Sequence, residues 1–337
     1  MKKPLYLIMY LLFFLGGCNE EEKMIEKPEV IITQDFPNAT NLNNNEQLEV
    51  VTWNIRQFPQ NKTYTEPYVQ SLLEAWNADV YLFQEISNKI KLLNMVDSMD
   101  GYSAVVDDES GNLGFALVYK KEFITFNTKK ELWADTPRSD DGDIDYSNNA
   151  QYQFASRPPM ESYVTWSNGS KSIDLYLINV HYKCCGDDTY DINDSSDETS
   201  RRHHSSLLLT EYLINNRSTD KVIIVGDFNN VGDQAITNPT ISPFTDNISF
   251  QYSKGFKMMD QNILISSPSG FSWQGWTSSY SPAHFDHIII NEPLFSYIES
   301  AIVGVIDTPK ETGFTPANVA NRISDHQPVF LKFLIDN

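Results

Sequence analysis

Short apolar runs alternate with polar, turn-rich stretches along this chain, and most of the runs have the length of β-strands. Helical spacing is clearest in two places. In "EPYVQSLLEAW", the apolar side chains of Val69, Leu72, Leu73 and Trp76 fall on one helical face. A second helix is predicted over residues 197–216, where Ser and Asp precede an apolar stripe. The pattern therefore predicts a β-rich fold with a few amphipathic helices.

Polar side chains stand at the ends of six predicted strands, at positions that should otherwise be apolar. The groups that follow the runs "EVVTW", "DVYLFQ", "IDLYLINV" and "KVIIVG" are Asn54, Glu85, His181, and Asp227 with Asn229. The groups that precede the last two apolar runs, in "FDHIII" and "SDHQPVFLKF", are Asp286, and Asp325 with His326. If the last two strands run antiparallel to the first four, all of these side chains gather at one end of the packed sheets. The sequence thus predicts a polar site at a sheet edge.

Six short motifs carry a family resemblance. "TWNIR", "LFQEI", "NVHYK", "VGDFNN", "FDHI" and "SDHQPV", in this order over residues 50–330, resemble the endonuclease/exonuclease/phosphatase superfamily, which includes deoxyribonuclease I, exonuclease III and neutral sphingomyelinases. "GDFN" and "SDHxP" are the most specific of these elements. The resemblance implies an α/β (α+β) fold, a four-layer sandwich of two packed, mostly antiparallel β-sheets flanked by helices. It also implies metal-dependent hydrolysis of phosphate esters.

The resemblance assigns a role to the oxygen-bearing side chains. Glu85 and Asp325, with Asn54 as a neutral donor, resemble the family's Mg²⁺ or Mn²⁺ ligands, and oxygen ligands suit such hard cations. Asp227 and Asn229 are two residues apart, so in an extended backbone they project to the same side. By resemblance, Asp227 orients or deprotonates the attacking water and Asn229 holds a phosphate oxygen.

The remaining candidates are basic side chains and one partner carboxylate. Asp286 is expected to hydrogen-bond His326 and fix its tautomer, and the resemblance leaves open which of the pair carries the proton. His181 matches a histidine that contacts phosphate or assists the leaving group; the alternative is a histidine bonded structurally at a strand end. No acidic partner for His181 can be identified from the sequence. "FASRPP" makes Arg157 a candidate bidentate phosphate clamp, and the alternative is a surface arginine.

Charge narrows the range of partners. With 45 acidic and 25 basic residues among 337, the formal net charge is −20, which repels long polyanions and favours divalent cations. We therefore expect no tight, non-specific binding of nucleic acid. A loop with Asp141, Asp143 and Asp145 at alternate positions could bind a structural Ca²⁺, but Tyr146 stands where an EF-hand needs glycine, so a solvated loop is the alternative. His284, just before "FDH", is expected at the rim of the site.

The N-terminus predicts export. Residues 1–18 carry two lysines, an apolar stretch and then "LGGC", which resembles a lipoprotein signal with Cys18 as the acylated residue; an ordinary signal peptide is the alternative. Residues 19–46 are polar and Asn-rich and are interpreted as a flexible tether, followed by one domain over 47–337. The run "NEEEK" suggests the outer face of the bacterial outer membrane, or only a solvated tether. Cys184 and Cys185 are adjacent, and their redox state is left open.

Taken together, the sequence predicts a divalent-metal-dependent phosphodiester hydrolase, nuclease-like, monomeric and held at a membrane by its N-terminal lipid. Nucleic acid, nucleotides and phospholipid head groups all remain possible substrates. A phospholipid or inositol-phosphate phosphoesterase of the same fold is one alternative. A catalytically silent binding lipoprotein is the alternative from another class.

Overall fold

The computed structural model of the chain describes residues 35–108, 113–139, 146–186, 189–191, 193–230, 238–245, 255–261, 263, 270–275 and 281–336. The strands are β1 (Gln47–Phe58), β2 (Val80–Ile86), β3 (Tyr102–Val106), β4 (Gly114–Lys120), β5 (Ile124–Glu131), β6 (Met160–Ser167), β7 (Ser172–His181), β8 (Val222–Asp227), β9 (Phe256–Met258), β10 (Asp286–Asn291), β11 (Ile302–Val305) and β12 (Val329–Leu334). The helices are α1 (Thr65–Trp76), α2 (Lys89–Asp97), α3 (Ala150–Gln153), α4 (Glu198–Asn216), α5 (Ser242–Thr245), α6 (Thr308–Thr312) and α7 (Pro316–Arg322), with the 3-10 helix η3 (Glu292–Ser300).

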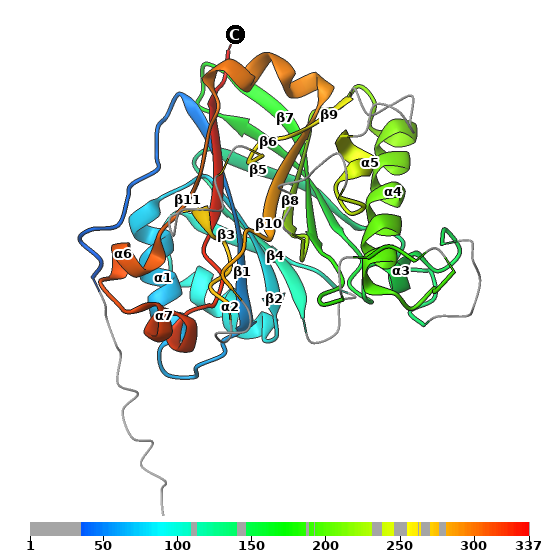
Figure 1. Cartoon of the computed structure of the whole chain (residues 1–337). Helices are drawn as coiled ribbons and strands as arrows, with labels where there is room; N and C mark the ends of the chain where they lie inside the picture. The colour runs from blue at the N-terminus through cyan, green and yellow to red at the C-terminus, as the bar shows by residue number, and fades with distance from the viewer. Residues whose placement is uncertain are drawn as a thin grey trace, which may run out of the picture. The chain divides into compact units, whose positions relative to one another are not determined.

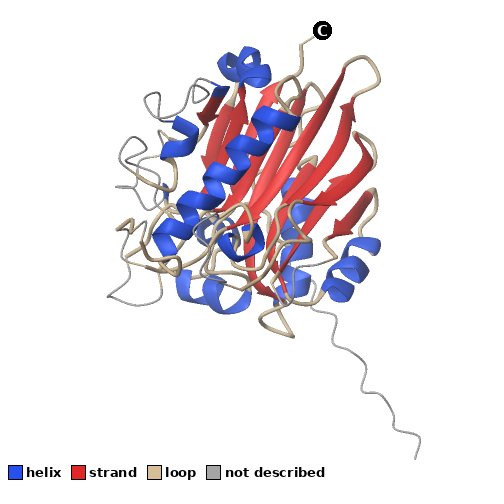
Figure 2. Ribbon diagram, turned by 90° about the vertical axis from the view of Figure 1, so that its right-hand side faces the viewer, coloured by secondary structure: helices blue, strands red, loops and turns tan. Residues whose placement is uncertain are grey.

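Successive side chains along a strand point to opposite faces of its sheet, and apolar side chains form a core on each face of both sheets. In β1, Leu48 and Val50 belong to the core between the two sheets, whereas Val51 and Trp53 belong to the core beneath α1 and α2. A third core lies between the second sheet and α4. Helices thus cover the outer faces of two stacked sheets (Figures 1 and 2). The expected four-layer sandwich is confirmed.

Strand direction brings the polar strand ends together. Among the described residues, the sheets have the orders β11-β12-β1-β2-β4-β3 and β5-β6-β7-β8-β10-β9. Neighbouring strands are antiparallel except for the parallel pairs β1–β2 and β7–β8 at the middle of each sheet. β12 runs antiparallel to β1, and β10 runs antiparallel to β8. This is the polarity that the sequence pattern requires for one shared site.

Both helices predicted from apolar spacing are present. α1 buries Val69, Leu72, Leu73 and Trp76 against the first sheet. α4 begins after Asp197, whose side chain accepts a hydrogen bond from the backbone N–H three residues later at 2.6 Å. The cap explains why the helix starts within one residue of the predicted position.

Residues 35–46 differ from the prediction. They were expected to belong to the tether, but Phe36 and Leu42 are buried, and the Leu42 N–H donates to the Trp76 carbonyl at 2.7 Å. Two buried apolar side chains hold this segment on the domain, so the part of the chain that packs on the domain begins before residue 47. Cys18 and the rest of residues 1–34 lie outside the described residues. In the part that is described, no helix combines the length and apolarity needed to cross a bilayer.

Candidate active site

Three site residues are direct neighbours across the second sheet. His181 of β7 is in register with Asp227 of β8, and Asp227 is in register with Asp286 of β10. Side chains at paired positions point to the same face of a sheet, so these three groups share one surface. β1 and β2 of the first sheet contribute Asn54 and Glu85 at the same end of the sandwich.

Asn54 joins the two sheets. Its Nδ2 donates to Glu85 Oε1 at 3.1 Å and to Asp227 Oδ2 at 3.0 Å, and its Oδ1 accepts the backbone N–H of Arg56 at 3.0 Å. Two carboxylate acceptors require the amide nitrogen, not its oxygen, on their side. Asn54 Oδ1 accepts only this one hydrogen bond and so retains a lone pair, and its expected role as a metal ligand stays a prediction. Through its amide nitrogen, Asn54 holds Glu85 and Asp227 in position.

His326 lies between two carboxylates. Its Nδ1 donates to Asp286 Oδ2 at 2.8 Å, and its Nε2 lies 3.7 Å from Asp227 Oδ2. The adjacent Ser324 fixes this turn, because its hydroxyl donates to the Asn54 carbonyl and accepts the His326 backbone N–H. The pair expected between Asp286 and His326 is therefore present, with the second ring nitrogen aimed at Asp227.

Burial and neighbouring charge set the protonation of this group. Burial alone would lower the pKa of His326, but Asp286 and Asp227 outweigh it and raise the pKa to about 10. Burial raises the pKa of Asp227 to about 7, opposed by His326 and reinforced by Asp286. The arrangement thus favours a protonated imidazole facing a carboxyl group that ionises near neutrality.

His181 completes the inner wall. Its Nε2 lies 3.6 Å from Asp227 Oδ2 and 3.9 Å from Glu85 Oε1. Its Nδ1 is buried and has no hydrogen-bond partner among the described residues. Burial, followed by Arg157 and His326, holds the pKa of His181 well below its ordinary value. A neutral His181 beside a charged His326 results.

Arg157 and Asn229 both bind the backbone that follows β7. Arg157 Nε donates to the His181 carbonyl at 3.0 Å, and its Nη2 donates to the Tyr182 carbonyl at 2.6 Å. The side-on edge of the guanidinium is therefore used by the protein, and the expected bidentate clamp can involve only the end-on edge of Nη1 and Nη2. Asn229 Nδ2 also donates to the Tyr182 carbonyl, at 3.1 Å.

The backbone at Asn229 is not extended, contrary to the prediction. β8 ends at Asp227, and Asn229 has φ of 50°, in the left-handed region. This turn lets the Asn229 backbone N–H donate to Asp227 Oδ1 at 2.8 Å. Asn229 thus orients Asp227 through its main chain, and one hydrogen of its amide remains for a substrate oxygen.

Glu85 and Asp325 have the donor chemistry of a hard-cation site. Each oxygen of Glu85 accepts one hydrogen bond, from Asn54 or from the Gln57 backbone, so each retains a lone pair, and its side chain is 17% exposed. Asp325 Oδ2 lies 3.5 Å from Arg56 Nη1 and 3.4 Å from Trp273 Nε1. Glu85 also has a positive φ of 63°, and such strain collects at functional sites. Carboxylate oxygens of this kind suit a hard divalent cation.

A second carboxylate–histidine cluster consists of Asp260, His284 and His287. Asp260 Oδ2 accepts hydrogen bonds from His284 Nε2 at 2.8 Å and from His287 Nδ1 at 2.6 Å, and His287 Nε2 lies 2.7 Å from the Asn230 carbonyl. Because both His287 nitrogens face acceptors, both carry hydrogens, and the cluster is a buried ion pair. The rim position expected for His284 is therefore wrong: it is buried against Asp260.

Several contributors to the site were not assigned a role from sequence. Ser324 and Ser272 fix the backbone of their neighbours, since Ser272 Oγ accepts the Asp286 N–H at 3.0 Å. Ser324 could have been found because it precedes the "DH" pair directly. Asp260 leaves no local signal, because its partners lie more than 20 residues away in the chain. The loop residues Asp141, Asp143 and Asp145 lie outside the described residues.

A match to a family sequence profile identifies the protein family. The sequence profile of the Endonuclease/Exonuclease/phosphatase family matches residues 51–326, which is most of the chain. The chain belongs to this family. Members of the Endonuclease/Exonuclease/phosphatase family are phosphoester hydrolases and typically use divalent metals. A search of curated protein sequences gives no match.

Solved structures of similar fold cover most of the chain. TDP2 of D. rerio in complex with a single-strand DNA product has 15% identity and a TM-score of 0.59, covering 85% of this chain and 98% of its own. An Endonuclease/Exonuclease/phosphatase protein of Bacteroides vulgatus has 13% identity and a TM-score of 0.57, with 86% and 99% covered. A mannosyl-6-phosphatase of Bacteroides thetaiotaomicron has 17% identity and a TM-score of 0.53, with 86% and 100% covered. At these identities the similarity shows the fold alone.

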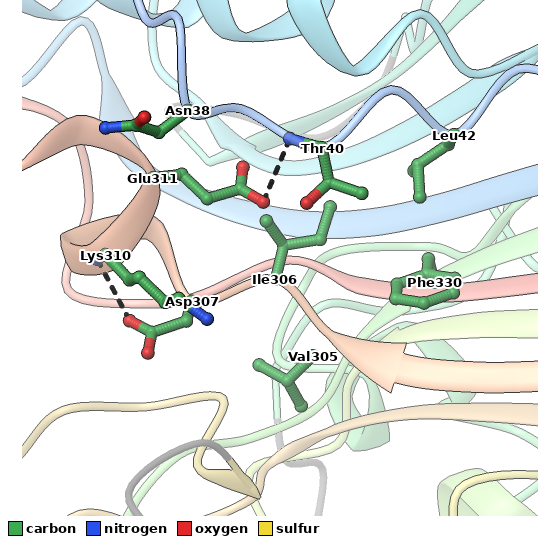
Figure 3. A pocket seen from close by; sticks show the side chains of 9 residues that line it. All are labelled: Asn38, Thr40, Leu42, Val305, Ile306, Asp307, Lys310, Glu311 and Phe330. Carbon is green, nitrogen blue, oxygen red and sulfur yellow. Dashed lines mark hydrogen bonds between the residues drawn. The ribbon is translucent and has the colours of Figure 1, made fainter.

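A cavity of about 520 Å³ lies apart from these groups (Figure 3). It is lined by Asn38, Thr40, Leu42, Val305, Ile306, Asp307, Lys310, Glu311 and Phe330, none of which belongs to the site above. Glu311 accepts hydrogen bonds from the Thr40 backbone and from Trp76 Nε1. Its carboxylate is therefore engaged in holding the N-terminal segment on the domain.

Proposed function

We propose that this family member is a divalent-metal-dependent phosphodiester hydrolase in which Asp227 and His326 act as a pair. The observation that carries the proposal is the position of the Asn54 amide nitrogen, which bonds both Glu85 and Asp227 while Asp227 faces the His326–Asp286 pair. A cation-binding carboxylate, a water-activating carboxylate and a charged imidazole are thereby held in one network. Together these groups can supply cation binding, water activation and charge stabilisation, which metal-assisted phosphate-ester hydrolysis uses.

The spacing around Asp227 suits an attacking water. Asp227 Oδ2 is 3.7 Å from His326 Nε2 and 3.6 Å from His181 Nε2, distances too long for direct hydrogen bonds. A water or a phosphate oxygen placed among these groups would contact more than one of them. Asp227 would orient this water and accept its proton, while the Asn54 and Asn229 N–H groups fix the carboxylate.

The phosphate would be held by cationic and amide donors. His326, kept protonated by Asp286, would donate from Nε2 to a phosphate oxygen, and the end-on edge of Arg157 and the free amide hydrogen of Asn229 would bind others. When bound by Glu85 and Asp325, Mg²⁺ or Mn²⁺ supplies charge neutralisation at the phosphate and the leaving oxygen.

Turnover of an activated diester tests the proposal. The full chain is incubated with bis(p-nitrophenyl) phosphate in Mg²⁺, in Mn²⁺ or in chelator, alongside Asp227→Asn, His326→Gln and the exposed strand variant Asp174→Asn as a control. We expect metal-dependent turnover that falls by about 10²–10⁴-fold in the two site variants and is unchanged in Asp174→Asn. Turnover in chelator, or equal rates in all variants, would contradict the proposal.

The substrate is best sought with a panel. We expect diesters to be the better substrates. Sugar phosphates are included because one neighbour of similar fold is a mannosyl-6-phosphatase. DNA, RNA, sphingomyelin, inositol phosphates and nucleotides complete the panel. If none is hydrolysed with metal present, the alternative of a silent binding lipoprotein is favoured.

We also propose that Cys18 is lipidated and anchors the chain to the outer membrane. The proposal rests on the "LGGC" sequence that ends the apolar N-terminal stretch. In a bacterium that expresses the full chain, the protein should fractionate with membranes, and Cys18→Ala should release it or leave its signal uncleaved. Equal membrane association together with equal signal cleavage in both proteins would refute lipidation at this residue.

A further inference from the structure

The turn after β7 carries two cysteines that the proposed mechanism does not use. Cys184 and Cys185 are both free thiols, and their Sγ atoms lie 3.1 Å apart. Adjacent side chains in an extended backbone point to opposite sides. Here Cys185 has φ of 75°, in the left-handed region, and the two sulfurs lie on the same side of the chain. The backbone is therefore already bent for a reaction between them.

A buried arginine holds this turn in shape. Arg202 Nη1 donates to the Lys183 carbonyl at 3.1 Å and to the Cys185 carbonyl at 2.6 Å, and its Nη2 donates to Thr199 Oγ1. Lys183 Nζ donates to the Cys184 carbonyl at 3.0 Å and lies 3.9 Å from Cys184 Sγ. These bonds hold the backbone on both sides of the two cysteines.

The same turn is bonded to two groups of the candidate active site. The Tyr182 carbonyl, two residues before Cys184, accepts hydrogen bonds from Arg157 Nη2 and from Asn229 Nδ2. The Tyr182 N–H donates to the Asp227 carbonyl at 2.9 Å. A change in the turn will therefore shift the groups that we expect to bind phosphate.

We propose that Cys184 and Cys185 form a redox-active pair that closes to a disulfide at the wall of the active site. The oxidant is a disulfide compound, small or protein-bound. The Cys184 thiolate attacks one of its sulfurs and releases the first thiol, and Cys185 then loses its proton and attacks the Cys184 sulfur to release the second. One protein dithiol and one disulfide thus become one protein disulfide and two thiols. A bond of about 2.05 Å requires the sulfurs to approach by about 1 Å.

The location of the bond can be tested by peptide mass. Trypsin cleaves after Lys183 and after Arg201, so both cysteines fall on peptide 184–201, separate from Cys18. The full chain is equilibrated with mixtures of reduced and oxidised glutathione, free thiols are alkylated, and the peptide is weighed. In oxidising mixtures we expect the peptide to have lost two hydrogens and to resist alkylation. After reduction, the same peptide should carry two alkyl groups. Glutathione adducts on both cysteines, or a link to Cys18, would overturn the proposal.

A comparison with the unfolded chain tests whether the fold prepares the pair. In concentrated urea the clamp by Arg202 is lost, so the equilibrium constant for ring closure should be at least about tenfold lower than in the native protein. Equal constants would show that the folded turn contributes nothing to ring closure, and would contradict the inference that the fold prepares the two cysteines to react. Cys184→Ser and Cys185→Ser are the matched controls, and each should give a single glutathione adduct and no ring.

The effect on turnover rests on the proposed hydrolase function and is measured separately. Because Arg157 and Asn229 share the Tyr182 carbonyl, closure of the ring should raise KM for the diester severalfold with a smaller change in kcat. Cys184→Ser, which can take up glutathione but cannot close the ring, should not show this rise in KM. Turnover by the oxidised and reduced forms with equal KM would refute the coupling. Absence of turnover in every state would count against the hydrolase function and leave the mass result to decide the disulfide.

Discussion

Asp286 and Asp260 are both buried carboxylates that accept hydrogen bonds from histidine, yet the histidines differ in what their second nitrogen reaches. His326 presents Nε2 to Asp227 at 3.7 Å, whereas His287 Nε2 is 2.7 Å from the Asn230 carbonyl. A nitrogen that already donates to a backbone carbonyl has no proton to exchange with a substrate. The His326–Asp286 pair is therefore suited to exchange a proton with a substrate. The His287–Asp260 pair is suited to stabilising the loop after β8.

Replacement of Asp286 by Asn should lower activity more than stability. Burial lowers the pKa of His326 and Asp286 opposes this, so the variant loses much of the charge that keeps His326 protonated. We expect kcat for the diester to fall about 10²–10⁴-fold. Steady-state kinetics measures the fall in kcat, and an NMR titration of His326 measures the change in its protonation. An unchanged His326 titration would show that Asp286 does not set its charge.

Replacement of Asp260 by Asn is the matched experiment and should act mainly on stability. Burial would raise the pKa of Asp260, but His287 and His284 outweigh it and lower the pKa below its ordinary value. Removing this charge leaves a buried imidazolium without its partner, which should reduce the free energy of unfolding by about 3–5 kcal/mol. Urea unfolding monitored by circular dichroism gives the value. A loss below about 1 kcal/mol would mean that His287 is neutral.

Among the elements, the parallel pair β7–β8 contains a position with no room for a side chain. Gly226 has φ of 144°, and a Cβ added there would lie 2.0 Å from the Val180 carbonyl oxygen. The strands can approach closely enough to align His181 with Asp227 only because this position lacks a side chain. The glycine of "VGDFNN" is thus a requirement of strand packing beside the candidate site groups.

Gly226→Ala should destabilise the protein by at least about 2 kcal/mol, from overpacking added to an unfavourable backbone conformation. Gly169→Ala is the control, because Gly169 also has a positive φ, of 86°, with nothing within 4 Å of an added Cβ. It should lose only about 1 kcal/mol. Denaturant unfolding of both variants separates the two contributions. Equal losses would refute the steric argument.

The elements also show how far the sequence alone could predict this molecule. Strand polarity and the gathering of Asn54, Glu85, Asp227 and His326 follow from where polar residues interrupt apolar runs, and the structure confirms both. The atoms that each group offers do not follow from such a pattern. The orientation of the Asn54 amide depends on two carboxylates from other strands. Long-range hydrogen bonds of this kind have no counterpart in local spacing.

Other deviations have similar causes. The left-handed turn at Asn229 follows from its bond to Asp227, and Arg157 loses one edge to backbone carbonyls that lie 24 and 25 residues away. Residues 35–46 are polar enough to resemble a tether, yet Phe36 and Leu42 attach them to the domain. Two apolar residues in a polar stretch give too weak a signal to predict this packing.

At the scale of the whole molecule, a buried acid pair links stability to pH. Glu49 of β1 and Asp79 before β2 are both buried, and Asp79 Oδ2 also accepts from Trp166 Nε1 of the second sheet. Burial and then Asp79 raise the pKa of Glu49 to about 9. An acid with a raised pKa binds a proton in the folded state that the unfolded chain has released. Its stabilising contribution is therefore complete below about pH 4.5 and is lost as the pH rises to about 9.

We expect the free energy of unfolding to fall by about 2 kcal/mol between pH 6 and pH 8 through this group. Glu49→Gln, which keeps the shape and a hydrogen-bond donor, should remove this part of the slope. Urea unfolding of both proteins across the pH range measures the difference. A variant with the same slope as the parent would show that Glu49 is ionised in the folded protein.

The net charge of −20 gives a second prediction for the whole molecule. If long DNA is among the substrates, salt should screen the repulsion between two polyanions. kcat/KM for DNA should then rise from low to physiological ionic strength, while the rate on a small mono-anionic diester changes much less. A fall in the DNA rate would indicate a local basic binding surface.

The first and last strands of the first sheet meet at the site, since Trp53 Nε1 donates to the His326 carbonyl and Ser324 Oγ donates to the Asn54 carbonyl. A polypeptide growing on the ribosome therefore lacks the complete set of candidate site groups until residue 326 has been added. Termination before residue 326 would leave the site without His326, even if most of both sheets had formed.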